Sequence, residues 1–92
     1  MSSDFIRRRV IVHGRVQGVF FRHSIRERAQ AHGVSGWVCN RPDGGVEGVL
    51  EGPAEGVERL LRFCETGPSH ARVERVETSD EAPQGLSGFA IR

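Results

Sequence analysis

The chain lacks several features that would assign it at once to a common class of protein. Its two cysteines are too few for a disulfide framework in a small domain. The sequence has no run of the roughly 20 apolar residues that are needed to cross a bilayer. The start Met1–Asp4 is not followed by the apolar core of a signal peptide. We therefore expect a cytoplasmic protein that is neither secreted nor inserted into a membrane.

Charge of one sign is also lacking, since 13 basic residues stand against 12 acidic ones and the formal net charge is +1. No global field would therefore recruit a nucleic acid or a membrane surface. The local cluster Arg7–Arg9 fits the solvated face of a strand, with a short nucleic-acid-binding arm as the alternative. The histidines and cysteines show no paired spacing typical of metal ligands. We expect no nucleic-acid partner, no metal and no cofactor.

The apolar residues that are present follow the periods of strands and helices in turn. Alternation and turn residues predict strands over Phe5–His13, Gly36–Asn40, Val46–Glu51, roughly Ala71–Thr78, and Phe89–Arg92. One helix is predicted from near Phe21 or Arg22 to about His32 by the helical spacing of Phe21, Ile25, Ala29 and His32. A second is predicted from Pro53 to Gly67 by the apolar stripe of Val57, Leu60, Leu61 and Cys64.

The fourth strand and Cys64 need separate comment. Val73 and Val76 are out of phase by one residue, so we expect a bulge in the fourth strand or a start only near Arg75. Cys64 falls on the apolar stripe of the second helix, where a reduced cysteine acts as a small hydrophobe. We do not expect a bridge from Cys64 to Cys39.

The order of elements is strand, helix, strand, strand, helix, strand, followed by a short extra strand. Two strand–helix–strand units related in this way predict a ferredoxin-like α+β sandwich. We expect an antiparallel sheet of four to five strands, with both helices on one face because the crossovers are right-handed. Residues 1–92 are expected to form one domain.

The segment most relevant to function is Gly14–Arg22, which joins the first strand to the first helix. The first N–H groups of a helix lack internal partners, and its dipole adds positive charge there. Two glycines let successive N–H groups turn toward one anion, and Arg22 could add two charged hydrogen bonds. The spacing is not that of a nucleotide-binding loop. From these residues alone, a bound anion and an ordinary tight turn remain equal alternatives.

The same segment, G-R-V-Q-G-V-F-F-R, resembles the signature G-x-V-Q-G-V-x-F-R of the acylphosphatase family. Gly36–Asn40, with the following Asp43–Gly44 and Val46–Glu47, is similar to the second signature of that family. The resemblance covers nearly the whole chain, through Glu51–Pro53, Gly67–Pro68, Ala71–Val73 and Gly88–Phe89.

The resemblance implies a hydrolase that cleaves acyl phosphates to a carboxylate and inorganic phosphate, without a metal or cofactor. It implies that Arg22 and Asn40 are catalytic, with Asn40 holding the attacking water. It further implies that the phosphate is held by Arg22 and by backbone amides of the loop, namely Val16, Gln17, Gly18, Val19, Phe20 and Phe21. The expected partners are a small acyl phosphate and, as product-like ligands, inorganic phosphate or sulfate, and the expected state is a monomer.

Several other interpretations stay open beside this one. A nucleic-acid-binding module is disfavoured because the third strand carries two acids and no aromatic residue. A regulatory domain would bind phosphate without turnover, and a third alternative is an accessory unit of a larger carbamoyl-transfer enzyme. We expect Phe20 and Phe21 to pack the loop against the core. Cys39 should point away from the side of Asn40, and Trp37 is left without a role.

Overall fold

The computed structural model describes residues 4–92, so the part of the secretion argument that rests on residues 1–3 lies outside the described residues. The strands are β1 (Phe5–Arg15), β2 (Ser35–Asn40), β3 (Val46–Pro53), β4 (Arg72–Glu81) and β5 (Phe89–Ile91). The helices are α1 (Phe21–Ala31) and α2 (Ala54–Thr66). Within the described residues, neither helix is long and apolar enough to cross a membrane.

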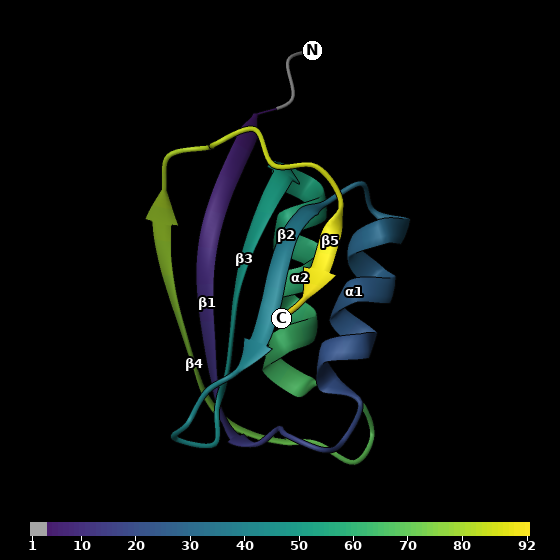
Figure 1. Ribbon diagram of the computed structural model, residues 1–92, viewed down its shortest axis with the longest axis vertical. Coiled ribbons are helices and arrows are strands. Elements are labelled where there is room, and N and C mark those ends of the chain that lie inside the picture. Colours follow the sequence, from purple (N-terminus) through teal and green to yellow (C-terminus); the bar gives the residue numbers. More distant parts are fainter. Residues whose placement is uncertain (1–3) are drawn as a thin grey trace.

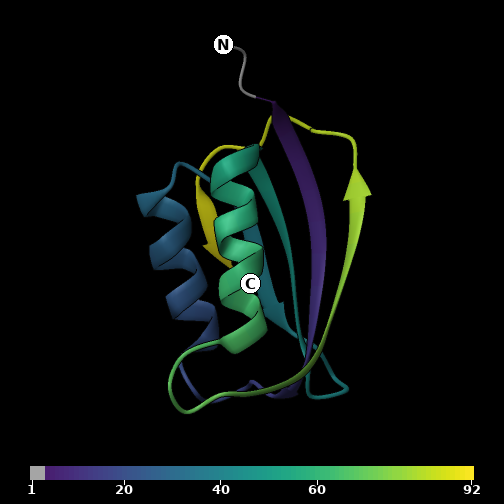
Figure 2. The same ribbon diagram turned by 180° about the vertical axis from the view of Figure 1, so that it is seen from behind.

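One five-stranded sheet has the order β4-β1-β3-β2-β5, which places β1 and β3 in the middle (Figure 1). The first four strands pair antiparallel, as predicted, whereas β5 pairs parallel with β2. Seen from behind, both helices cover the same face of the sheet (Figure 2). The predicted ferredoxin-like α+β sandwich is confirmed, and the added parallel edge strand makes its sheet mixed.

The core lies between this sheet face and the two helices. Helix α2 buries Val57, Leu60 and Cys64 of the predicted stripe and also Gly56, whereas Leu61 is only partly buried. Helix α1 buries Phe21, Ile25 and Ala29 at helical spacing and ends one residue before His32, whose side chain is exposed. Burial of each larger side chain among them, such as Leu60, Phe21 or Ile25, stabilises the fold by about 1.5–3 kcal/mol.

Strand β4 carries the expected bulge but is longer than predicted. Its register with β1 shifts between His13 and Gly14, and Glu74 is the extra residue. The strand continues to Glu81, three residues past the predicted end at Thr78, because its end pairs with the arginine cluster of β1. The polar loop therefore begins later than the sequence indicates.

The arginine cluster is not the fully solvated face that the sequence predicts. Arg7 is only 5% exposed because its guanidinium lies between Glu51 and Glu81, at 3.1 and 2.8 Å. Glu51 is itself fully buried and accepts hydrogen bonds from the backbone N–H groups of Gln84, Gly85 and Leu86. These bonds attach the loop between β4 and β5 to the sheet.

Candidate active site

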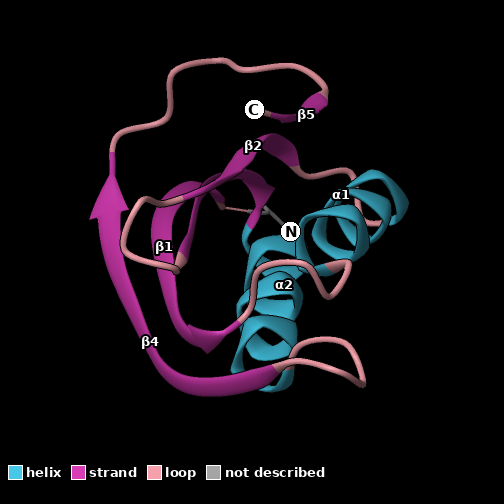
Figure 3. Cartoon of the chain, turned by 60° about the horizontal axis from the view of Figure 1, so that its bottom comes forward, coloured by secondary structure: helices cyan, strands magenta, loops and turns pink. Residues whose placement is uncertain are grey.

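The loop between β1 and α1 runs along one end of the sandwich, the end that comes forward in Figure 3. Gly14 has a φ of 129°, and a Cβ there would lie 2.2 Å from the carbonyl oxygen of Arg72. Gly18 has a φ of 72°, in the left-handed region that glycine adopts without strain. Close approach of β4 therefore requires glycine at position 14, and the left-handed turn favours glycine at position 18.

Helix α1 begins without a side chain to cap it. The N-cap residue is Phe20, whose backbone is left-handed with a φ of 63°, and it makes no capping hydrogen bond. No acidic residue lies in the first turn of α1. The first N–H groups of this helix are thus left for an external acceptor, and the helix dipole favours an anion there.

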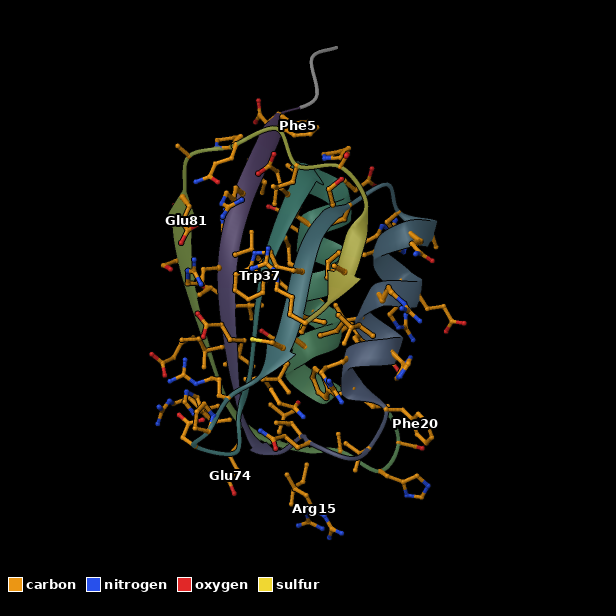
Figure 4. The ribbon with its side chains drawn as sticks, viewed as in Figure 1. Phe5, Arg15, Phe20, Trp37, Glu74 and Glu81 are labelled. Carbon is orange, nitrogen blue, oxygen red and sulfur yellow. The ribbon has the colours of Figure 1, made fainter. Side chains whose placement is uncertain are left out.

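The two phenylalanines of the motif differ in what they do. Phe21 is 1% exposed, and its ring packs against Phe63 at a centroid distance of 6.0 Å, as expected for an anchor of the loop. Phe20 is 75% exposed, so the prediction that it packs against the core is wrong. Figure 4 shows Phe20 and Arg15 pointing away from the body of the molecule at this end. The left-handed backbone at Phe20 turns its side chain outward while its neighbour enters the core.

A cavity of about 220 Å³ opens at this junction. It is lined by Val16, Gly18, Phe20, Phe21, Arg22 and His23. Arg22 and four of the six loop residues expected to hold the phosphate thus line one cavity, whereas Gln17 and Val19 are not among its lining residues. Val16 is 1% exposed and holds the loop to the core from below. A larger hollow of about 300 Å³ lies between the two helices, but no loop residue lines it.

Asn40 reaches the same end of the molecule from another strand. It pairs with Val46, which is 1% exposed in the core under the helices. Since paired residues point to the same side of a sheet, Asn40 lies on the helix face, where α1 begins. Cys39 and Trp37 have the opposite parity, and Trp37 stacks with Arg9 on the open face, at 5.6 Å from the ring centroid.

The loop and the hairpin that carries Asn40 are joined directly. The Gln17 side chain donates hydrogen bonds of 2.8 Å to the carbonyl oxygens of Arg41 and Gly45. The family resemblance implicates Gln17 only through its backbone amide, and no periodicity could reveal a contact over 24 and 28 residues. The strand order places β2 beside β3 and β3 beside β1, which brings this hairpin next to the loop.

The acidic groups near the site are already paired with cations. The Arg41 guanidinium and the Gly45 N–H hold the pKa of the Asp43 carboxyl below its usual value. Glu47 accepts from Arg41 at 2.9 Å and from Arg9 at 2.6 Å. These carboxylates are therefore held in ion pairs on the hairpin, which leaves the cavity around Arg22 with a positive character.

The thiols and metal-ligating side chains add no further chemistry to this end. Cys39 and Cys64 are both free, and burial raises the pKa of the Cys64 thiol to about 12. Among residues 4–92, no three His, Cys, Asp or Glu side chains gather as a metal site. The groups that this end of the described chain offers to a ligand are thus backbone amides, the Arg22 guanidinium and the Asn40 carboxamide.

Comparison with known proteins identifies the family of this chain. The sequence profile of the Acylphosphatase family matches residues 8–91. An acylphosphatase of Rubrobacter xylanophilus is 61% identical over 85 residues, 91% of this chain and 77% of the relative. One of Natronomonas pharaonis is 49% identical over 98% of both chains. The solved structure of an acylphosphatase from Coxiella burnetii superposes with a TM-score of 0.92 at 35% identity, covering 97% of this chain and 94% of its own. This chain therefore belongs to the acylphosphatase family of hydrolases.

Proposed function

We propose that the protein hydrolyses the carboxyl–phosphate bond of small acyl phosphates at the cavity beside Arg22. The phosphoryl group accepts hydrogen bonds from the loop amides between Val16 and Phe21 and from the Arg22 guanidinium. The observation that carries this proposal is the uncapped start of α1, where a glycine turn and Arg22 line one cavity of about 220 Å³. These donors stabilise charge on the equatorial oxygens of a loose transition state, as a metal ion would elsewhere.

Asn40 orients the attacking water in this proposal. A carboxamide accepts and donates hydrogen bonds but is no strong base, so it fixes the water without taking its proton. The water oxygen attacks phosphorus, the bond from phosphorus to the acyl oxygen breaks, and the carboxylate leaves with the electron pair. The proton passes to a phosphoryl oxygen, so that inorganic phosphate is the second product.

The substrate chemistry explains why no acid or metal is required. An acyl phosphate is a mixed anhydride, and its carboxylate leaves without protonation. We further propose that residues 1–92 act as one cytoplasmic domain and as a monomer, with inorganic phosphate or sulfate binding as product-like ligands. A sedimentation measurement that returned a stable dimer would refute the monomer.

The test is hydrolysis of benzoyl phosphate by the purified protein in the presence of a chelator, with inorganic phosphate as inhibitor. We expect turnover that the chelator does not change, and competitive inhibition by phosphate. Activity that disappears in chelator and returns with a divalent cation would contradict the metal-free mechanism. Phosphate binding without turnover would instead identify the alternative, a regulatory domain that only binds an anion.

A further inference from the structure

The side chain of Gln17 makes two hydrogen bonds that its place in the loop does not explain. Its Nε2 atom donates to the carbonyl oxygens of Arg41 and Gly45, each at 2.8 Å. Both partners are acceptors, so the nitrogen end of the carboxamide must face them. Both N–H groups of the side chain are therefore used on the hairpin between β2 and β3, and not on the cavity.

The two carbonyls that Gln17 binds belong to the turn of that hairpin. The N–H of Arg41 donates to the Gly45 oxygen at 2.8 Å, and the N–H of Gly44 donates to the Arg41 oxygen at 3.1 Å. Each carbonyl thus accepts one bond within the turn and a second from Gln17. Asn40 immediately precedes Arg41, so Gln17 holds the backbone next to the residue proposed to orient the water.

The main chain of Gln17 is equally well fixed at the other side. It lies between Val16, which is 1% exposed, and Gly18, whose left-handed φ of 72° forms the turn. The Gln17 side chain consequently spans the two parts of the proposed site, the amides that hold the phosphoryl group and the hairpin that carries Asn40. Its length sets the spacing between them.

We infer that Gln17 is a positioning residue that fixes Asn40 relative to the phosphate-binding loop. This inference rests on the proposed function, because it assumes the roles given there to the loop and to Asn40. Attack on phosphorus requires a water placed in line with the leaving group, and a displacement of about 1 Å can cost about 100-fold in rate. The phosphoryl group is held by the loop amides and Arg22 in this proposal, so a shift of the hairpin should leave its binding unchanged.

Strand pairing keeps the hairpin folded when these two bonds are removed. β2 and β3 pair over six residues from Ser35 to Asn40, and β3 continues its pairing with β1 as far as Val46. Gln17→Met therefore tests position rather than folding, because methionine has a similar length, carries no charge and has no N–H to donate. Gln17→Ala serves as a second variant, and Gln30→Met on the exposed side of α1 is the matched control.

The experiment is a double-mutant cycle on benzoyl phosphate, with kcat, the inhibition constant of phosphate and thermal unfolding measured for each protein. We expect Gln17→Met to lower kcat by about 10- to 100-fold while the phosphate constant stays within about threefold of the parent. In the Asn40→Ala background the same substitution should have no further effect on kcat, because the residue that it positions is gone.

Two results would overturn the inference. If the losses of kcat from Gln17→Met and Asn40→Ala multiplied in the double variant, Gln17 would act independently of Asn40. If the phosphate constant rose in parallel with the fall in kcat, Gln17 would serve the loop instead. Both results leave the proposed function intact, whereas full activity of Asn40→Ala alone would refute the role of Asn40 on which the inference rests.

Discussion

The two ends of the sheet use the same local chemistry for different purposes. At one end, the Glu51 carboxylate accepts bonds of 3.0, 2.7 and 3.0 Å from the N–H groups of three successive residues, and Arg7 adds a fourth at 3.1 Å. Gly85 turns this segment with a φ of 76°, close to the 72° of Gly18 in the loop at the other end. Such a left-handed residue lets neighbouring N–H groups point toward one anion, as they do toward Glu51 and as we propose for the loop.

The difference between the two ends lies in where the anion comes from. Glu51 is built into the chain and fully buried, so its nest of N–H groups is permanently filled and serves stability. The loop that leads to α1 has no acid in the first turn of its helix, and an arginine beside it. An anion-binding turn stabilises the fold when a side chain fills it. When no side chain does, it is free to take a ligand.

We call the end with the loop before α1 the open end, because no side chain fills its anion site, and the end with Glu51 the closed end. The largest effect is expected from removing Arg22 at the open end. Arg22→Ala deletes a guanidinium that can form two charged hydrogen bonds to the phosphoryl group, each worth roughly 1.5–3 kcal/mol. We expect kcat/KM for benzoyl phosphate to fall about 100- to 1,000-fold, with a parallel loss of phosphate inhibition.

The control for this variant is Arg26→Ala, one turn further along α1, which removes the same charge. Its kcat/KM should change by less than about threefold, since it removes only screened surface charge. Equal losses in the two variants would mean that the general positive field, and not a bond from Arg22, attracts the substrate.

At the closed end, Glu51→Gln should affect stability and not catalysis. The substitution leaves Arg7 buried with one anionic partner fewer, and breaking a buried pair costs about 3 kcal/mol. Urea unfolding measures this loss, with Glu58→Gln on the exposed side of α2 as the control. Activity per folded molecule should remain that of the parent. A fall in kcat as large as that of Arg22→Ala would show that the two ends are not independent.

A smaller effect is expected when the open end is filled from within. Phe20→Asp places a carboxylate at the start of α1, where the helix dipole favours negative charge, and aspartate tolerates the left-handed backbone better than phenylalanine. We expect about 0.5 kcal/mol of added stability in urea unfolding and a large rise in the phosphate inhibition constant.

The neutral variant Phe20→Asn separates the effect of the left-handed backbone from that of the added charge. Asparagine tolerates this backbone as aspartate does but brings no negative charge. It should therefore leave phosphate inhibition close to that of the parent, with a smaller gain in stability than Phe20→Asp. Loss of inhibition in both variants would mean that the Phe20 ring itself, and not an empty anion site, governs binding.

The smallest effect is a difference in acid sensitivity. Burial raises the pKa of Glu51, but the N–H donors of Gln84, Leu86 and Gly85 and the Arg7 guanidinium lower it more, so that it lies below its usual value of 4.5. A carboxyl whose pKa is lower in the folded state stabilises the fold fully above its unfolded pKa. That contribution is lost as the pH falls below 4.5 toward the folded value.

The measurement is Tm against pH for the parent and for Glu51→Gln. We expect the Tm of the parent to fall more steeply below pH 4.5, so that the two curves converge in acid. Parallel curves over this range would show that the Glu51 carboxylate does not contribute through its charge.

The local spacing of apolar residues was sufficient to predict the elements that flank the loop at the open end. Helical spacing assigned Phe21, Ile25 and Ala29 to the buried face of α1, and the phase change between Val73 and Val76 located the bulge of β4. The same spacing excludes Phe20 from that buried face, so the signal that would have corrected its assignment was present in the sequence.

Pairings between distant residues could not be predicted in this way. Arg7 and Glu51 are 44 residues apart, and a charged residue at either position is by itself typical of a strand face exposed to solvent. The extension of β4 to Glu81 follows from the same long-range charges, and the two bonds of the Gln17 side chain depend on where the hairpin folds. Such contacts can be predicted only after the order of the strands is known, because no local sequence pattern favours them.

The most direct test of the proposed site is the behaviour of Asn40→Ala with benzoyl phosphate and inorganic phosphate. We expect kcat to fall by about 100-fold or more, because the attacking water is no longer held in position. We also expect the phosphate inhibition constant to stay close to that of the parent, because the loop and Arg22 are intact. Near-normal kcat in this variant would contradict the assignment of the water, and loss of phosphate inhibition would contradict the separation of binding from attack.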